Sequence, residues 1–192
     1  MRSKQLYIRR AIEASFLKLL DERPFEKITV KNIVDDCGLT RNTFYNYFED
    51  TYDVVDGLLR ALVCDVLDSD EAPDTLVGTM SPVMSFAREH PRAIAHLYRS
   101  SKREELMLCF DKMFELMAER LCASSVRSGR LAAEDEALMA QSCRFLLSGF
   151  FAQWIVKGME TPLEESLERL EMLFKIDHGG KEKKDDGSYT TH

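Results

Sequence analysis

Apolar residues recur every three or four positions along most of the chain, the spacing that gathers side chains on one face of an α-helix. In the first such segment Ile12, Phe16 and Leu19 follow this spacing, and a second segment begins at Val30 and ends at Cys37. Strand-like alternation of apolar and polar residues is rare. The pattern therefore predicts an all-α fold.

The same spacing continues beyond these segments and predicts helices at 52–67, 83–89, 92–100, 104–126, 134–157 and 163–174. Residues 68–82 are rich in Asp, Ser, Thr, Gly and Pro, so we expect a loop there. The pair His90-Pro91 is expected to separate two helices. Residues 177–192 have too few apolar side chains to offset the entropy of ordering, so we expect a disordered tail.

A tight turn follows the segment that ends at Cys37. Gly38 can adopt a left-handed backbone conformation without the steric cost of a Cβ atom, so it is expected to end that helix. Thr40 can cap the next helix by accepting a hydrogen bond from the backbone N–H of Asn42 or Thr43. The sequence thus predicts two short helices that meet at a sharp angle.

The second of these helices has a polar face. Phe44 and Phe48 lie four residues apart, which is enough to dock it. Arg41 and Asn42 suit base edges, because arginine pairs with guanine and asparagine with adenine in the reading helix of a helix-turn-helix. An ordinary helical hairpin with a solvated polar face would have the same spacing. The candidate DNA contacts are Thr29, Lys31, Thr40, Arg41, Asn42, Thr43, Tyr45, Asn46 and Tyr47.

This segment resembles the DNA-binding domain of TetR-type transcriptional regulators. The residues that match the family pattern are Thr29, Val30, Ile33, Gly38, Leu39, Thr40, Thr43, Phe44, Tyr45, Tyr47, Phe48 and Val54. The resemblance implies an N-terminal three-helix helix-turn-helix domain at 1–50. It also implies a C-terminal helical ligand-binding and dimerisation domain at 51–176, before the tail.

The resemblance further implies a function. We expect a homodimeric transcriptional regulator that binds a palindromic operator in double-stranded DNA through the helix at 40–47. Such regulators are typically repressors that a small-molecule ligand releases from DNA. Their last two long helices form a four-helix dimer interface, which corresponds here to the helices near 134–157 and 163–174. The alternative for these two helices is packing within one chain only.

Two departures from the family pattern concern charge. Thr51 stands where the family often has a lysine that reaches a phosphate, and Glu49 and Asp50 precede it. These carboxylates would weaken DNA binding unless they point away or cap the following helix. They favour an alternative function, a TetR-like co-regulator that binds a protein partner rather than DNA.

Formal charge differs along the chain. The whole chain carries −7, whereas residues 1–46 contain nine Lys or Arg against six Asp or Glu, a net charge of +3. Four cations precede the turn: Arg2, Lys4, Arg9 and Arg10. They could clamp DNA phosphates as an N-terminal arm, or they could simply solvate the start of the first helix.

A cavity in the second domain would hold the ligand, which we expect to be an apolar or aromatic small molecule. Methionine and aromatic side chains adapt to flat organic molecules. Their spacing of three and four is equally that of a helix core. The candidate ligand contacts are Phe86, Phe110, Met113, Phe114, Met117, Phe145 and Trp154.

The residues do not favour other classes of function. The five cysteines form no close pair in sequence and the four histidines are scattered, so we predict no disulfide framework, metal site or cofactor. The sequence has no glycine-rich phosphate loop and no other catalytic signature, which predicts that the protein is not an enzyme. Neither a membrane-spanning run nor a signal peptide is evident, so we expect a cytoplasmic protein with no membrane partner.

Overall fold

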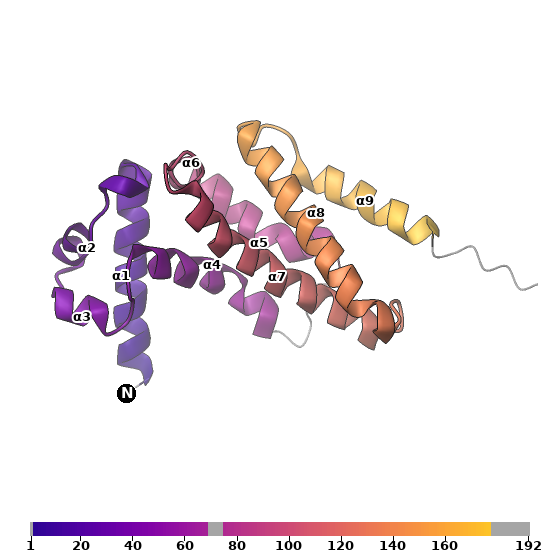
Figure 1. The fold of residues 1–192 in the computed structure, drawn as a ribbon, viewed down its shortest axis with the longest axis horizontal. Coiled ribbons are helices and arrows are strands. Elements are labelled where there is room, and N and C mark those ends of the chain that lie inside the picture. Colours follow the sequence, from indigo (N-terminus) through magenta and orange to yellow (C-terminus); the bar gives the residue numbers. More distant parts are fainter. Residues whose placement is uncertain (1, 69–74, 178–192) are drawn as a thin grey trace, which may run out of the picture.

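The computed structural model describes residues 2–68 and 75–177, and every regular element in those two ranges is a helix. The elements in chain order are α1 (Arg2–Glu22), η1 (Phe25–Lys27), α2 (Val30–Cys37), α3 (Arg41–Tyr45), α4 (Thr51–Asp68), α5 (Leu76–Glu89), α6 (Pro91–Tyr98), α7 (Arg103–Arg127), η2 (Ala133–Asp135), α8 (Glu136–Val156) and α9 (Leu163–Asp177). Figure 1 shows an N-terminal lobe of α1 to α3 and a C-terminal lobe of α5 to α9. The predicted all-α fold is confirmed.

The core of the N-terminal lobe forms where the apolar faces of its three helices meet. Phe16 of α1, Ile33 of α2 and Phe44 of α3 are fully buried there. Burial of one such side chain contributes about 1.5–3 kcal/mol. Because α3 is too short to be stable alone, its position depends on this shared core.

Helix α4 joins the two lobes. It packs against α1 on one side and against α7 on the other. Its buried side chains include Val54, Val55, Leu59 and Val63, which follow helical spacing. The helix predicted at 52–67 is therefore present, with one residue more at each end.

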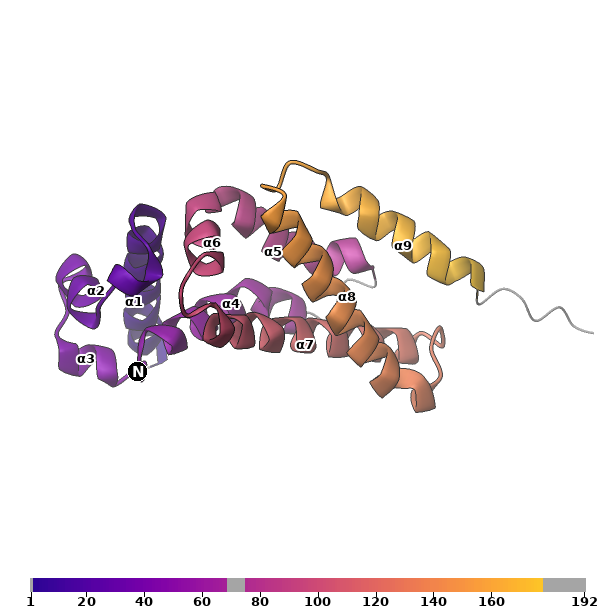
Figure 2. The same ribbon diagram turned by 45° about the horizontal axis from the view of Figure 1, so that its top comes forward.

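A second connection between the lobes runs through α6, which Figure 2 shows facing α1. Asp21 near the end of α1 has its Oδ2 atom 2.7 Å from Nδ1 of His90, and its Oδ1 atom accepts a hydrogen bond from the N–H of Ala93 at 3.2 Å. His96 donates from Nδ1 to the carbonyl oxygen of Leu20 at 2.6 Å. A movement of α6 would therefore strain these hydrogen bonds and displace the end of α1.

Helices α7 and α8 cross at the centre of the C-terminal lobe (Figure 1). Their interface holds a cluster of rings in which Phe151 lies 5.5 Å from Phe114 and 6.0 Å from Trp154, measured between ring centroids. The indole N–H of Trp154 donates to the carbonyl oxygen of Thr161 at 2.8 Å. The one polar group of this buried ring system is therefore satisfied.

The loop predicted at 68–82 is wrong in its second half, because α5 begins at Leu76. The Oγ1 atom of Thr75 accepts a hydrogen bond from the N–H of Gly78 at 3.0 Å and caps this helix. Pro82 removes one backbone hydrogen bond, but Leu76, Met80 and Val83 bury one face of the helix and outweigh that loss. Residues 69–74 and the predicted tail from 178 onward lie outside the described residues.

Candidate functional site

The turn between α2 and α3 has the geometry that the sequence predicts. Gly38 has a φ of 68°, in the left-handed region, and its N–H donates to the carbonyl oxygen of Val34. Thr40 is extended, and its Oγ1 atom accepts a hydrogen bond from the N–H of Thr43 at 3.1 Å. These caps satisfy backbone groups that the two helices would otherwise leave unpaired. They also fix the direction in which α3 leaves the turn.

Two phenylalanines hold α3 and the residues after it against the lobe. Phe44 and Phe48 are 0% and 1% exposed, and their ring centroids are 5.8 Å apart. The chain turns after α3, where the N–H of Tyr47 donates to the carbonyl oxygen of Phe44 at 2.9 Å. The helix is therefore shorter than the predicted 40–47, and its orientation is set by one buried face.

The opposite face of α3 carries four of the predicted DNA contacts. Arg41, Asn42, Tyr45 and Asn46 are all exposed. Tyr45 is 57% exposed, and its ring packs edge-on against Phe44 with centroids 5.5 Å apart. Such packing limits the rotamers of Tyr45 while its hydroxyl group remains in solvent. The face therefore offers hydrogen-bonding groups with a restricted range of positions.

The other predicted contacts lie at helix starts or beside the buried face. Thr29, Lys31 and Thr40 are exposed, whereas Thr43 and Tyr47 are half-buried. The hydroxyl of Thr29 donates to Oδ1 of Asn32 at 2.7 Å, and the hydroxyl oxygens of Thr40 and Thr43 are 2.9 Å apart. These three hydroxyl groups already have partners within the protein, and those of Thr29 and Thr40 cap helices.

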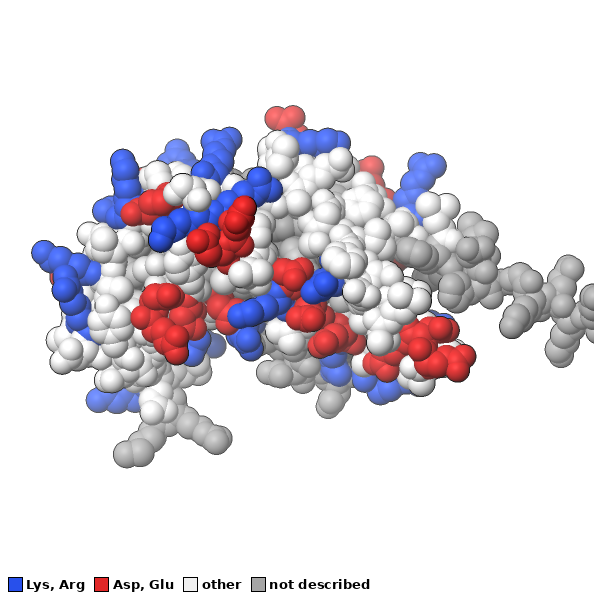
Figure 3. Space-filling view, in the orientation of Figure 1, with Lys and Arg blue, Asp and Glu red and all other residues white. Residues whose placement is uncertain are grey.

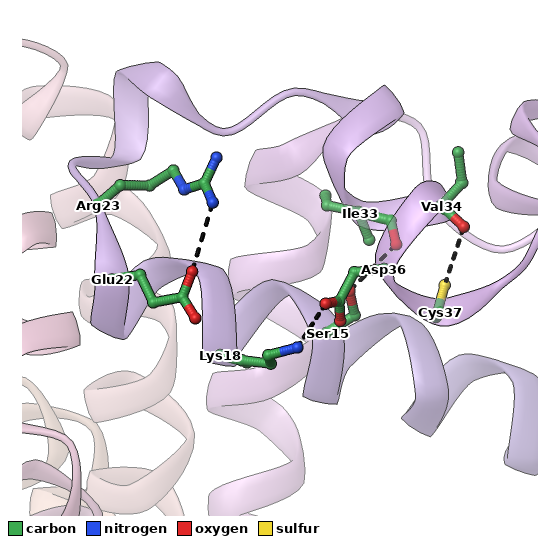
Figure 4. A network of polar contacts seen from close by, with 8 residues as sticks. All are labelled: Ser15, Lys18, Glu22, Arg23, Ile33, Val34, Asp36 and Cys37. Carbon is green, nitrogen blue, oxygen red and sulfur yellow. Dashed lines mark hydrogen bonds and ion pairs between the residues drawn. The ribbon is translucent and has the colours of Figure 1, made fainter.

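Polar contacts also hold α2 against α1, as Figure 4 shows. The hydroxyl of Ser15 donates to the carbonyl oxygen of Ile33 at 3.1 Å. Nζ of Lys18 lies 2.6 Å from Oδ1 of Asp36, and this hydrogen bond lowers the pKa of the Asp36 carboxyl group. Asp36 is therefore paired with α1 and is not a free anion beside α3.

Arg9 contacts other residues of the N-terminal lobe and is not part of a free N-terminal arm. Its Nε donates to Oε1 of Glu13 at 3.1 Å, and its guanidinium carbon lies 4.7 Å from the centroid of the Phe48 ring. Burial raises the pKa of the Glu13 carboxyl group, and the contact with Arg9 partly offsets this rise. Arg9 thus links α1 to the segment that follows α3.

The remaining cations of the predicted arm are less constrained. Lys4 and Arg10 are exposed, whereas the side chain of Arg2 lies outside the described residues. In Figure 3 Lys and Arg side chains project from the upper and left edges of the N-terminal lobe, Asp and Glu side chains also lie on its visible face, and charges of both signs lie over the C-terminal lobe.

Asp50 caps α4. A carboxylate that caps this helix is not expected to weaken DNA binding. The Oδ1 atom of Asp50 accepts hydrogen bonds from the N–H groups of Tyr52 at 2.8 Å and Asp53 at 2.9 Å. The carboxylate of Asp53 in turn accepts from the N–H of Glu49 at 3.0 Å. The side chain of Glu49 remains exposed.

Comparison with known proteins identifies the domain to which this surface belongs. Residues 15–58, from within α1 to within α4, match the family model described as "Bacterial regulatory proteins, tetR family". These residues therefore form a TetR-type DNA-binding domain. A segment of 88 residues is 30% identical to an uncharacterized HTH-type transcriptional regulator, YxbF of Bacillus subtilis (strain 168), and covers 41% of this chain. The match spans only 23% of that curated relative's length.

Solved structures share the TetR-type fold along most of the chain. The dihydroxyacetone kinase operon activator DhaS has a TM-score of 0.65 at 14% identity, with 90% of this chain and 96% of that chain covered. A putative TetR-family regulator from Syntrophomonas wolfei str. Goettingen gives 0.63 at 17% identity, with 96% and 100% covered. The fatty acid degradation regulator FadR from Bacillus halodurans gives 0.56 at 16% identity, with 92% and 97% covered. At these identities the likeness concerns the fold alone.

The family match agrees with the prediction that the chain is not an enzyme, since the family model and the curated relative are both described as transcriptional or regulatory proteins. Within residues 2–68 and 75–177, no group of three His, Cys, Asp or Glu side chains could hold a metal ion. In the same ranges no helix has both the length and the apolar character needed to cross a membrane.

Among the described residues, only some of those predicted to contact a ligand line the cleft between α7 and α8. Those that are buried are Phe110, Met113, Phe114, Met117 and Trp154. Of these, Phe110 and Phe114 also line a cleft of about 400 Å³ between α7 and α8. Phe86 lies elsewhere and packs against His90, with ring centroids 4.9 Å apart.

Phe145 does not line the predicted apolar cavity. It is 57% exposed, whereas Cys143, Leu147 and Phe151 form the buried face of α8. The guanidinium carbon of Arg144 lies 4.8 Å from the centroid of the Phe145 ring. The helical spacing of apolar residues does not show that Phe145 faces outward. Because α8 is apolar on nearly all sides, periodicity alone cannot separate its inner face from its outer face.

Several residues of the α7–α8 cleft were absent from the predicted set, namely Tyr98, Arg103 and Phe151. Phe151 lies four residues after Leu147, but because α8 is apolar on nearly all sides this spacing did not mark Phe151 as inward-facing. Arg103 and Tyr98 gave no sequence signal, because their proximity arises from the turn between α6 and α7.

Proposed function

We propose that this chain is a DNA-binding transcriptional regulator whose helix α3 reads base edges in the major groove of an operator. The proposal rests on the contrast between the two faces of α3. Phe44 is fully buried on one face, while Arg41 and Asn42 are exposed on the other. An arginine and an asparagine on an exposed helix suit guanine and adenine respectively.

Contacts to phosphates would flank this helix. Lys31 is exposed in the first turn of α2, where the unpaired backbone N–H groups also favour an anion. The hydroxyl group of Tyr45 can donate to a phosphate oxygen on the other side. Asp50 does not weigh against this arrangement, because its carboxylate caps α4.

We propose further that the regulator is a homodimer formed through α8 and α9. Leu138, Phe145 and Val156 of α8 are 68%, 57% and 74% exposed, and Met172 and Leu173 of α9 are exposed as well. Apolar side chains left uncovered in this number on two neighbouring helices favour a protein partner. A two-fold dimer would present two copies of α3 to the half-sites of a palindromic operator.

The proposal extends to the direction of regulation and to its control by a ligand. We take the protein to be a repressor, released from the operator when a small molecule binds in the C-terminal lobe. Support comes from the two connections between the lobes, α4 and the contact of Asp21 with His90 and Ala93. A ligand that favours another position of α6 would thereby disfavour the arrangement that binds DNA.

The salt dependence of binding to a random-sequence DNA duplex tests the DNA-binding role. Fluorescence anisotropy should give a logarithm of affinity that falls linearly with the logarithm of salt concentration. Lys31→Ala should reduce that slope by about 1, since one phosphate contact is lost. As a matched control, Arg127→Ala removes an exposed cation at the far end of α7 and should leave the slope unchanged.

The alternative function is a co-regulator that binds a protein partner, and the exposed carboxylate of Glu49 favours it. Such a protein should ignore duplex DNA at moderate ionic strength. Absence of salt-dependent binding by the full chain would therefore reject the DNA-reading role and favour the co-regulator.

A further inference from the structure

The cleft between α7 and α8 has an aromatic floor. Phe110, Phe114 and Phe151 line it, and their side chains are almost fully buried. The ring centroids of Phe110 and Phe151 are 6.1 Å apart, so the floor is a continuous apolar surface. The volume of about 400 Å³ lies within the range of about 300–1,000 Å³ that is usual for small-molecule sites.

The rim of this cleft has one available charge, and it is positive. Asp111 on the rim is already paired, with an oxygen 3.1 Å from Nη1 of Arg144. Arg103 on the rim has no carboxylate partner among the described residues. Its guanidinium carbon lies 5.0 Å from the centroid of the Tyr98 ring, which restricts its position without neutralising it.

We propose that this cleft binds a small organic acid with a flat apolar body. The carboxylate of the acid would pair with Arg103, which offers two parallel N–H donors to a carboxylate. The body would lie over Phe110 and Phe114 at the base of the cleft and against the more exposed Met107 and Leu108 on its wall, which provide apolar surface. Arg103 sets the preference for an anion, and the floor sets the preference for a planar group.

The position of Arg103 gives this site a regulatory meaning, which rests on the proposed function. Arg103 is the first residue of α7 and follows closely after Ser100 and Ser101. Both serines hydrogen-bond to Glu26 of the N-terminal lobe, the backbone N–H of Ser101 at 2.6 Å. An acid that reorients Arg103 therefore acts beside a direct contact between the lobes.

Isothermal titration calorimetry of the full chain without DNA tests the site, with 2-naphthoate as the acid and 2-naphthamide as its neutral analogue. The wild-type protein should bind the acid at least about 10-fold more tightly than the amide. Arg103→Gln should remove that preference. Arg127→Gln, an exposed arginine away from the cleft, should retain it.

A second variant addresses the floor. Ala152 lines the cleft, and Ala152→Phe should fill it and abolish binding of both molecules. The inference is overturned if the wild-type protein binds no acid at about 1 mM, or if Arg103→Gln keeps the preference for the acid. Arg103 is exposed, so its replacement tests the site even if Ala152→Phe fails to fold.

The two proposals fail separately. A protein that binds 2-naphthoate but retains no duplex DNA would reject the regulator and leave the acid site in place. A protein that binds DNA and no acid would do the reverse.

Discussion

The carboxylate of Glu26 accepts hydrogen bonds from the hydroxyl and backbone N–H groups of the segment after α6, and the contact with Ser100 is the most important of them. Glu26 belongs to the N-terminal lobe and Ser100 to the C-terminal lobe. These hydrogen bonds favour the charged form and lower the pKa of Glu26 to about 2. The contact between the lobes is therefore strongest when Glu26 is ionised.

The lowered pKa of Glu26 predicts that the stability of the folded protein depends on pH. Because the pKa of Glu26 is lower in the folded than in the unfolded protein, its stabilising contribution is present above about pH 4.5 and is lost as pH falls towards about 2. Ser100→Ala should raise the pKa of Glu26 toward its ordinary value. Carbon-13 NMR titration of the Glu26 carboxyl group measures this, with Glu26→Gln used to assign the signal. An unchanged titration in Ser100→Ala would show that Ser100 does not cause the shift.

Asp50 and Glu49 should have separate effects although they are neighbours. Asp50→Ala removes two hydrogen bonds from the start of α4 and should lower the free energy of unfolding by about 0.5–2 kcal/mol. Glu49→Gln removes an exposed charge, so it should leave stability unchanged and tighten DNA binding. Urea unfolding and duplex binding of both variants provide the comparison. Equal losses of stability would contradict the assignment of Asp50 as the cap.

Gly38 is expected to resist replacement because of its backbone conformation. A Cβ atom added there would meet no atom within 4 Å, so the cost of Gly38→Ala comes from the φ of 68° alone. That cost should be about 1 kcal/mol in the free energy of unfolding, and Gly38→Asn should lose less, because asparagine tolerates the left-handed region. Thermal or urea unfolding distinguishes the two. Comparable stability of Gly38→Ala and wild type would mean that the turn relaxes.

Phe145 provides a test of the dimer. Phe145→Glu would bury a charge in the proposed interface and should weaken the dimer by about 2 kcal/mol or more. Tyr7→Glu changes an aromatic residue of α1 that is 74% exposed, and this variant should remain dimeric. Analytical ultracentrifugation over a range of concentrations reports both. A dimer that Phe145→Glu leaves intact would place the interface elsewhere.

Arg41 should contribute to specificity and not merely to affinity. If it reads a guanine, Arg41→Ala should cost about 1–3 kcal/mol on the cognate operator and relax the preference at one base pair. Binding to operators substituted one position at a time measures this. A uniform loss over all sequences would indicate a phosphate contact instead.

The helix-turn-helix could be predicted from the sequence because its signals are local. The conformation of Gly38, the cap at Thr40 and the burial of Phe44 and Phe48 each depend on residues within a few positions. The role of Arg9 could not be predicted in this way. Its contact with Phe48 joins residues that are distant in the sequence, and a solvated arginine has the same local pattern.

The C-terminal lobe was less predictable for three physical reasons. The period of α8 did not reveal that Phe145 points outward, since nearly every side of that helix is apolar. The polar, Gly- and Pro-containing composition of residues 68–82 predicts a loop, but the buried face of α5 outweighs it from Leu76 onward. The cleft rim, formed by Tyr98 and Arg103, depends on a turn whose geometry has no sequence signature.

Selection of genomic DNA fragments with the purified full chain, at low and at moderate salt, tests whether α3 reads an operator. Retained fragments should share a palindrome whose half-sites are about one helical turn apart, as two copies of α3 in a dimer require. Arg41→Ala should reduce enrichment of that palindrome. Retention of no common sequence at either salt concentration would contradict the account.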